Sequence, residues 1–294
     1  MPEPAGLPDG SRAVRLFHLS DIHFGLEDRE MLAWVERCID RENPGAVAIT
    51  GDLTMRARRR EYRAAIDWIK GLDASVTVEV GNHDLPYFNL VERFVDPYRR
   101  FRAIEMLIER EIDLGGIAIV PLKTTARAQW RLNWSKGWVT RRALDTTLAA
   151  IDALPPGTRV LVTAHHPLVE GGTSGSALTR GGERALEALA RRKVLAVLSG
   201  HVHDPFDLTR ETSAGPVRMI GAGTLSKRIR STPCSFNELT IEGGDVRVRV
   251  RNLERVPTAD MQITDVPPDA LPPRGQDEPV APVGAVPAVD PPVH

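Results

Sequence analysis

The sequence is poor in cysteine and in long apolar runs, and each shortage excludes a class of protein. Its 294 residues include only two cysteines, Cys38 and Cys234. They are too few and too far apart for a disulfide scaffold or a zinc finger, and we expect packed thiols in a reducing compartment. No apolar run reaches the roughly 18 residues that span a bilayer, and the N-terminus lacks the apolar segment of a secretory signal. We therefore expect a cytoplasmic protein without a membrane span.

An excess of charge of either sign is also missing. The formal net charge is −1 and the sequence pI is about 6.7. Dedicated nucleic-acid binders usually carry a basic excess, so nucleic acid is not the partner that this composition favours. Short arginine runs do occur at 58–60 and 99–102. We interpret them as solvated helix faces.

The distribution of proline divides the chain. Ten of its 23 prolines follow residue 256, in a stretch without hydrophobic periodicity. We predict a flexible leader at 1–12, a folded domain at 13–256 and a disordered proline-rich tail at 257–294. With 42% hydrophobic residues in the chain, the folded domain is large enough for a sizeable core.

Short apolar runs alternate with segments of helical spacing over the first 200 residues. The runs predict strands at 14–19, 46–50, 76–80, 160–163 and 194–198. The helical spacing predicts helices at 28–42, 59–70, 88–109, 141–153 and 181–192. Paired runs around Gly115-Gly116, at 112–114 and 117–122, suggest a hairpin, and residues 206–251 suggest two more. This pattern predicts an α/β protein with mixed sheets covered by helices.

The ends of the predicted strands carry the polar residues that matter most. The set comprises Asp21, His23, Asp52, Asn82, His83, Asp84, His165, His166, His201 and His203. Because ligands bind at the carboxyl ends of strands in open α/β sheets, these side chains can converge. Carboxylates and imidazoles together suit Mn, Fe, Zn or Co, and the lack of nearby cysteine argues against a structural zinc site. In Asp21-Ile22-His23, extended backbone would point both ligand types to one side.

In this order, the motifs resemble those of the calcineurin-like metallophosphoesterases. They are Asp21-x-His23, Gly51-Asp52, Gly81-Asn82-His83-Asp84, His165-His166-Pro167 and Gly200-His201-Val202-His203, and the resemblance spans residues 14 to about 252. It implies a four-layer α-β-β-α sandwich with two mixed β-sheets.

The resemblance also implies two divalent metal ions with divided ligands. Asp21, His23 and His203 would hold one ion, Asn82, His165 and His201 the other, and Asp52 would bridge both. The family pattern His-x-Pro favours His165 over His166, which would donate a hydrogen bond to the site or simply pack beside it.

A mechanism follows from this arrangement. A metal-bound hydroxide would attack the phosphorus in line, because paired cations make hydroxide available near neutral pH. His83 would stabilise charge on the phosphoryl group or protonate the leaving oxygen. Asp84 would orient His83 or cap the turn that follows it.

Differences from the motifs of known family subtypes limit the range of expected substrates. Asp52 is followed by Leu53-Thr54-Met55-Arg56 rather than by the Asp-Arg-Gly of the protein phosphatases, and Met55 replaces the tyrosine ligand of purple acid phosphatases. Thr54 and Glu61-Tyr62 resemble the bacterial cyclic-nucleotide phosphodiesterase group. We expect a phosphodiester substrate, with a 3′,5′-cyclic nucleotide as the candidate. The alternatives are another small-molecule or lipid phosphodiesterase or pyrophosphohydrolase, a phosphomonoesterase, a nuclease and a non-catalytic scaffold.

The irregular segment 123–138 is the expected contact region for a small-molecule phosphoester. Arg127, Arg131 and Asn133 offer donors for phosphate, and Trp130 offers a flat face. The competing interpretation is that tryptophans hold a long loop in place. The oligomeric state is left open.

Overall fold

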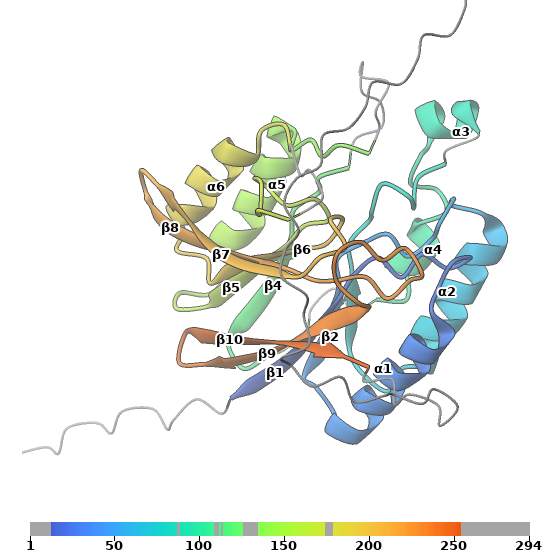
Figure 1. Cartoon of the computed structure of the whole chain (residues 1–294). Helices are drawn as coiled ribbons and strands as arrows, with labels where there is room; N and C mark the ends of the chain where they lie inside the picture. Colours follow the sequence, from blue (N-terminus) through green and yellow to red (C-terminus); the bar gives the residue numbers. More distant parts are fainter. Residues whose placement is uncertain are drawn as a thin grey trace, which may run out of the picture. The chain divides into compact units, whose positions relative to one another are not determined.

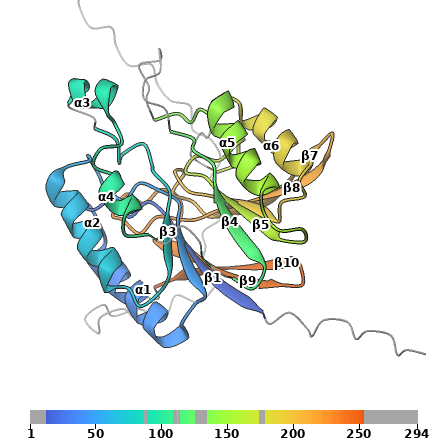
Figure 2. The same cartoon turned by 180° about the vertical axis from the view of Figure 1, so that it is seen from behind.

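A computed structural model describes residues 13–86, 89–108, 112, 114–125, 135–173 and 179–253. The predicted leader at 1–12 and the predicted tail at 257–294 lie outside these residues. The described part contains two five-stranded sheets, shown from opposite sides in Figures 1 and 2.

The first sheet has the strand order β10-β9-β1-β2-β3. Its strands are β1 (Val14–Leu19), β2 (Ala46–Ile49), β3 (Val76–Val78), β9 (Ser235–Glu242) and β10 (Asp245–Asn252). β1, β2 and β3 run parallel, whereas β9 runs antiparallel to both of its neighbours. The sheet is therefore mixed, and β1 lies at its centre.

The second sheet has the order β4-β5-β6-β8-β7. Its strands are β4 (Ile117–Pro121), β5 (Arg159–Thr163), β6 (Ala196–Ser199), β7 (Phe206–Thr212) and β8 (Gly215–Gly221). β7 alone runs antiparallel, beside β8. The hairpins predicted over 206–221 and 236–251 are confirmed as β7–β8 and β9–β10.

Two helices accompany each sheet. They are α1 (Arg29–Glu42) and α2 (Arg59–Gly71), then α5 (Arg141–Asp152) and α6 (Gly182–Ala190). The Thr140 side chain accepts a hydrogen bond from the Ala143 amide and so caps the N-terminus of α5. Among the described residues, no helix is both long enough and apolar enough to span a bilayer.

Alternating side chains of the strands build three apolar layers. Phe17 of β1 packs with α1 residues such as Val35, whereas its neighbour Leu16 faces Leu161 of the other sheet. A third cluster joins the second sheet to α5 and α6. Since successive strand residues face opposite sides, each sheet is covered on both faces. The predicted four-layer α-β-β-α sandwich is confirmed, with α1 and α2 on one side and α5 and α6 on the other (Figure 1).

Two predictions were wrong for the part of the chain that connects β3 to β4. Residues 88–109 contain two short helices, α3 (Leu90–Val95) and α4 (Arg102–Glu105), rather than one. Pro97 disfavours helical geometry in the residue before it, which accounts for the end of α3. Among the described residues no hairpin forms around Gly115-Gly116, and β4 pairs in parallel with β5 instead. The glycines do turn the chain, with φ of 65° and 81°, but the pairing partner comes from much later in the sequence.

Candidate metal centre

The polar residues predicted at the strand ends lie together where the two sheets meet. The backbone amide of His201, after β6, donates to Oδ2 of Asp21, after β1, at 2.8 Å. Nδ1 of His165, after β5, donates to the carbonyl oxygen of Thr50, after β2, at 2.8 Å. The carboxyl ends of parallel strands from both sheets thus form one edge, as the sequence predicted.

Asp21, His23 and His203 form the first group of ligand atoms. Nε2 of His203 lies 3.1 Å from Oδ1 of Asp21, and Nε2 of His23 lies 3.6 Å from the same oxygen. The two Nε2 atoms are 3.3 Å apart. All three side chains are buried, so their polar atoms face one another rather than solvent.

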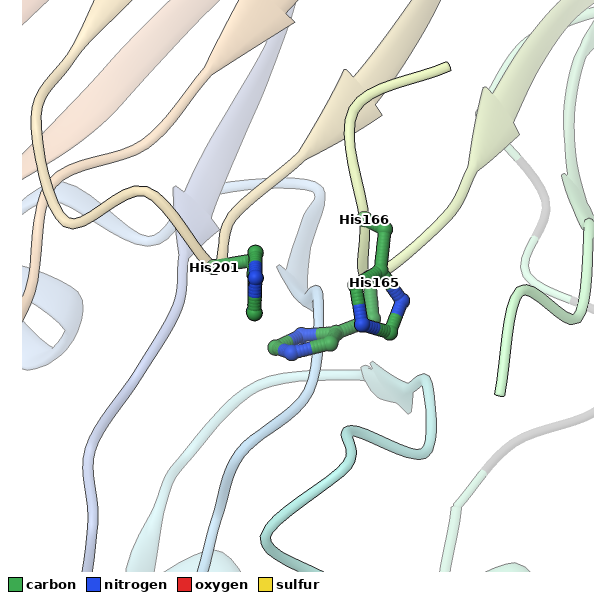
Figure 3. A group of neighbouring side chains, drawn as sticks. All are labelled: His165, His166 and His201. Atoms are coloured by element: carbon green, nitrogen blue, oxygen red, sulfur yellow. The ribbon is translucent and has the colours of Figure 1, made fainter. Parts of the chain in front are cut away.

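A second group surrounds His165. Its Nε2 lies 3.1 Å from Oδ1 of Asn82, and its ring centroid is 5.2 Å from that of His201. Figure 3 shows His201 across from His165 and His166. Oδ1 of Asp52 lies 3.4 Å from Nε2 of His165, and Oδ2 lies 3.8 Å from Nε2 of His23. The two oxygens of Asp52 therefore face the two groups separately.

Backbone carbonyls orient three of the imidazoles. Nδ1 of His165 donates to the carbonyl oxygen of Thr50 at 2.8 Å. Nδ1 of His203 donates to that of Arg228, and Nδ1 of His83 to that of Met55, each at 2.7 Å. A carbonyl oxygen can only accept a hydrogen bond, so each Nδ1 carries a proton and each Nε2 is turned towards the centre. Such orientation is typical of metal-binding histidines.

His166 differs from its neighbour because both of its ring nitrogens have partners. Nδ1 lies 2.9 Å from the Thr124 hydroxyl and Nε2 lies 2.9 Å from the Ser135 carbonyl oxygen. Although His166 lies close enough to His165 and His201 to join a ligand group, these bonds tie it to the chain around residue 135. Of the pair, only His165 directs a nitrogen towards Asp52.

The backbone is left-handed at five of the seven predicted metal ligands. Among the described residues, eight other than glycine have positive φ, and five of them are Asp21, His23, Asp52, His201 and His203. Such conformations are uncommon outside glycine and concentrate at functional sites. We expected extended backbone to aim Asp21 and His23 to one side, and that reason was wrong. The chain instead turns at left-handed residues after β1, β2 and β6.

Close backbone packing requires glycine before two of the ligands. A Cβ at Gly81 would lie 2.1 Å from Oδ1 of Asp52, and one at Gly51 would lie 2.6 Å from Nδ1 of His165. Gly51 also has a φ of 100°. A side chain at either position would displace an atom of the centre.

The buried charges stabilise one another. Burial alone would raise the pKa of Asp52, but His165 and His83 reverse this and hold that pKa well below its usual range. Burial would lower the pKa of His165, but Asp52 raises it to about 9. Burial lowers the pKa of His23 and of His201 to about 3, so these two imidazoles are neutral at physiological pH.

These residues fit a pair of divalent cations. Oδ1 of Asp21 is buried, and it has no hydrogen-bond partner within the described part of the chain. An unpartnered buried carboxylate oxygen is costly unless a cation neutralises it. Two carboxylates, an amide oxygen and imidazole nitrogens are also the donors that Mn, Fe, Zn and Co accept.

Asp84 joins two of the loops that carry ligands. Its carboxylate accepts hydrogen bonds from the backbone amides of Leu53, Thr54 and Gly81 at 3.2, 2.8 and 2.9 Å. The ring of His83 is instead oriented by the Met55 carbonyl oxygen. The contacts of Asp84 are thus those of a positioning residue that fixes the loops after β2 and β3.

The predicted substrate contacts Arg127, Trp130, Arg131 and Asn133 lie outside the described residues. The structure places a different cation at the centre, Arg228, between β8 and β9. Sequence reasoning passed over it because it follows no predicted strand end. The short basic run Lys227-Arg228-Ile229-Arg230 was the only signal.

Comparisons with known proteins agree with this geometry. The sequence model of the calcineurin-like phosphoesterase family matches residues 14–205. A comparison with curated proteins gave no match.

Similar solved structures include a dimetal phosphatase from Danio rerio, with a TM-score of 0.56 and 15% identity, covering 82% of this chain and 99% of that one. They also include the purple acid phosphatase PPD1 from yellow lupin (Lupinus luteus) seeds, with a TM-score of 0.59 and 15% identity, covering 82% and 52%. PhoD has a TM-score of 0.55 and 10% identity, covering 80% and 66%. At these identities the likeness concerns the fold.

Proposed function

The chain belongs to the calcineurin-like phosphoesterase family, and we propose that it hydrolyses a phosphodiester with two divalent metal ions. One observation carries this proposal. The two oxygens of Asp52 face two separate ligand groups, at 3.4 Å from His165 and 3.8 Å from His23. A carboxylate between two sets of donors is suited to bridging a pair of cations.

In this proposal the ligands form two sets. Asp21, His23 and His203 would hold one ion, and Asn82, His165 and His201 would hold the other. Once bound, such a pair polarises phosphoryl oxygens and supplies a water-derived nucleophile near neutral pH.

The remaining residues of the site would position the ligand loops, stabilise the reacting groups and keep bulk water out. Asp84 would keep the two ligand loops in register through the amides that it binds. His83, whose ring is held by the Met55 carbonyl oxygen, would stabilise charge on the phosphoryl group or protonate the leaving oxygen. The burial of Asp21, His23 and Asp52 keeps bulk water away and strengthens every charge interaction.

The substrate that we favour is a 3′,5′-cyclic nucleotide or a related small phosphodiester. The support is the sequence Asp52-Leu53-Thr54-Met55, which resembles that of the bacterial phosphodiesterase group. Monoester hydrolysis is the second candidate, because the similar structures from Danio rerio and yellow lupin are named as phosphatases. Met55 stands where a purple acid phosphatase would place its tyrosine ligand, so we do not expect that enzyme's iron–tyrosine site.

A direct test compares bis(p-nitrophenyl) phosphate with p-nitrophenyl phosphate, each with added Mn(II) and with EDTA. We expect metal-dependent cleavage that is faster on the diester. The variant Asn82→Ala should lose most of this activity, since it removes the amide oxygen 3.1 Å from His165.

Asn252→Ala, at the exposed end of β10, is the matched control and should retain wild-type rates. Faster cleavage of the monoester would replace the phosphodiesterase proposal by a phosphatase. A protein that binds the metal ions but cleaves neither compound nor any cyclic nucleotide would contradict the proposal.

A further inference from the structure

Arg228 extends its side chain into the metal centre. Its NH1 nitrogen lies 3.1 Å from Nε2 of His83 and 3.3 Å from Nε2 of His23. The same nitrogen lies 3.8 Å from the sulfur of Met55. The guanidinium therefore lies within hydrogen-bond distance of both imidazole nitrogens, at the border of the first ligand group.

The backbone of Arg228 is anchored to the same site. Its carbonyl oxygen accepts the 2.7 Å hydrogen bond from Nδ1 of His203. Its amide donates to the hydroxyl of Ser226 at 3.3 Å, and Ser226 is buried. Arg228 thus has a fixed position relative to a metal ligand, unlike a long side chain on a free surface.

The guanidinium lacks an anionic partner. Its described contacts are two imidazole nitrogens and a thioether, and no carboxylate of the described residues forms an ion pair with it. Guanidinium groups form strong, charge-assisted hydrogen bonds with carboxylates and phosphates. An anion that binds this guanidinium would come from outside the described residues.

The repulsion between the Arg228 guanidinium and bound metal ions indicates that the missing partner is an anion. A guanidinium this close to a pair of divalent cations is unfavourable unless an anion lies between them. A phosphoryl oxygen meets that requirement, and the planar guanidinium is well shaped to bind it. We infer that Arg228 is a substrate-binding residue that donates from its guanidinium to a phosphoryl oxygen beside His83. This inference rests on the proposed function.

The test measures binding of inorganic phosphate to the Mn(II)-loaded protein by calorimetry, together with the metal content. Removing a hydrogen bond to a charged group weakens binding about 10- to 100-fold. We expect that increase in the dissociation constant for Arg228→Met, with unchanged metal content. Arg228→Lys keeps the charge but not the planar donors, and should recover part of the affinity.

Arg230→Met is the matched control. Arg230 is exposed on the same loop, so this variant makes the same change of charge and should keep wild-type affinity. If both variants weakened phosphate binding equally, the effect would come from the overall positive charge of the loop, and the assignment of Arg228 would be overturned. Unchanged phosphate binding in Arg228→Met, or loss of metal in both Arg228 variants, would also overturn it.

The two proposals fail separately. If the wild type cleaves phosphodiesters while Arg228→Met binds phosphate normally, the inference fails and the proposed function stands. If phosphate binding depends on Arg228 but the wild type cleaves no phosphoester, the binding site stands and the proposed hydrolysis fails.

Discussion

The two sheets contribute different chemistry to the shared centre. The edge formed by β1, β2 and β3 supplies both carboxylates and the amide, at Asp21, Asp52 and Asn82, beside the single ligand imidazole of His23. The edge formed by β5 and β6 supplies imidazoles only. Neither edge holds a complete set of donors, so the centre exists only when the sheets pack together. The small side chains of Ala46, Ala48 and Ala196 in the core between the sheets are consistent with that close approach.

This division suggests unequal effects of substitution. A carboxylate of the first edge neutralises charge for the whole centre, whereas an imidazole of the second edge serves one group of ligands. Asp52 is the extreme case because its oxygens face both groups. Substitutions on the first edge should therefore cost more activity than substitutions on the second.

The largest effect should come from Asp52→Asn. This variant keeps the shape of the side chain but removes the negative charge between the groups. We expect phosphoester hydrolysis to fall by about 1,000-fold or more, since several kcal/mol of charge stabilisation is lost. Mass spectrometry of the bound metals should show less than one ion per chain.

The control is Asp40→Asn on the exposed face of α1, which should keep wild-type activity and metal content. If Asp52→Asn retained two ions and most of its activity, the centre would not depend on a bridging carboxylate. The contrast between the two edges would then lose its main support.

A smaller effect is expected for His201→Gln on the second edge. Loss of one imidazole ligand should weaken metal binding by more than the roughly 10- to 100-fold that follows the loss of a hydrogen-bond partner of a ligand, and leave about one ion per chain. The matched variant His166→Gln changes a neighbouring imidazole whose nitrogens bind Thr124 and Ser135. It should keep both ions while unfolding more easily by about 1–3 kcal/mol.

Metal titration of the two variants separates these outcomes. If His166→Gln lost an ion while His201→Gln kept two, the ligand assignment after β5 and β6 would have to be exchanged. Equal loss in both would mean that the second edge acts as a unit.

Much of the centre could be predicted from local sequence, because each ligand stands directly after a short apolar strand. Asp21, Asp52 and His165 were found in this way. Arg228 was not, because it lies on a loop between hairpins and reaches the site through tertiary packing alone. The fold shows the same limit. Gly115-Gly116 signalled a turn correctly, but a local signal cannot specify that β4 pairs with a strand some 40 residues later.

The smallest predicted effect concerns a link between the sheets. The hydroxyl of Thr163, on β5, donates at 3.1 Å to the carboxyl group of Glu79, just after β3. Burial raises the pKa of Glu79 to about 7, although Thr163 and Lys123 act in the opposite direction. The folded protein therefore holds this proton between about pH 4.5 and 7, where the unfolded chain releases it.

Since the folded state binds more protons, its stability should fall as pH rises through this range. Glu79→Gln keeps an oxygen for Thr163 but cannot ionise, so it should escape the loss. We expect the variant to gain about 2 kcal/mol over the wild type between pH 5 and pH 8, measured by denaturant unfolding at constant Mn(II). A difference independent of pH would mean that Glu79 ionises normally. The two sheets would then be joined here by a charged side chain rather than by a neutral hydrogen bond.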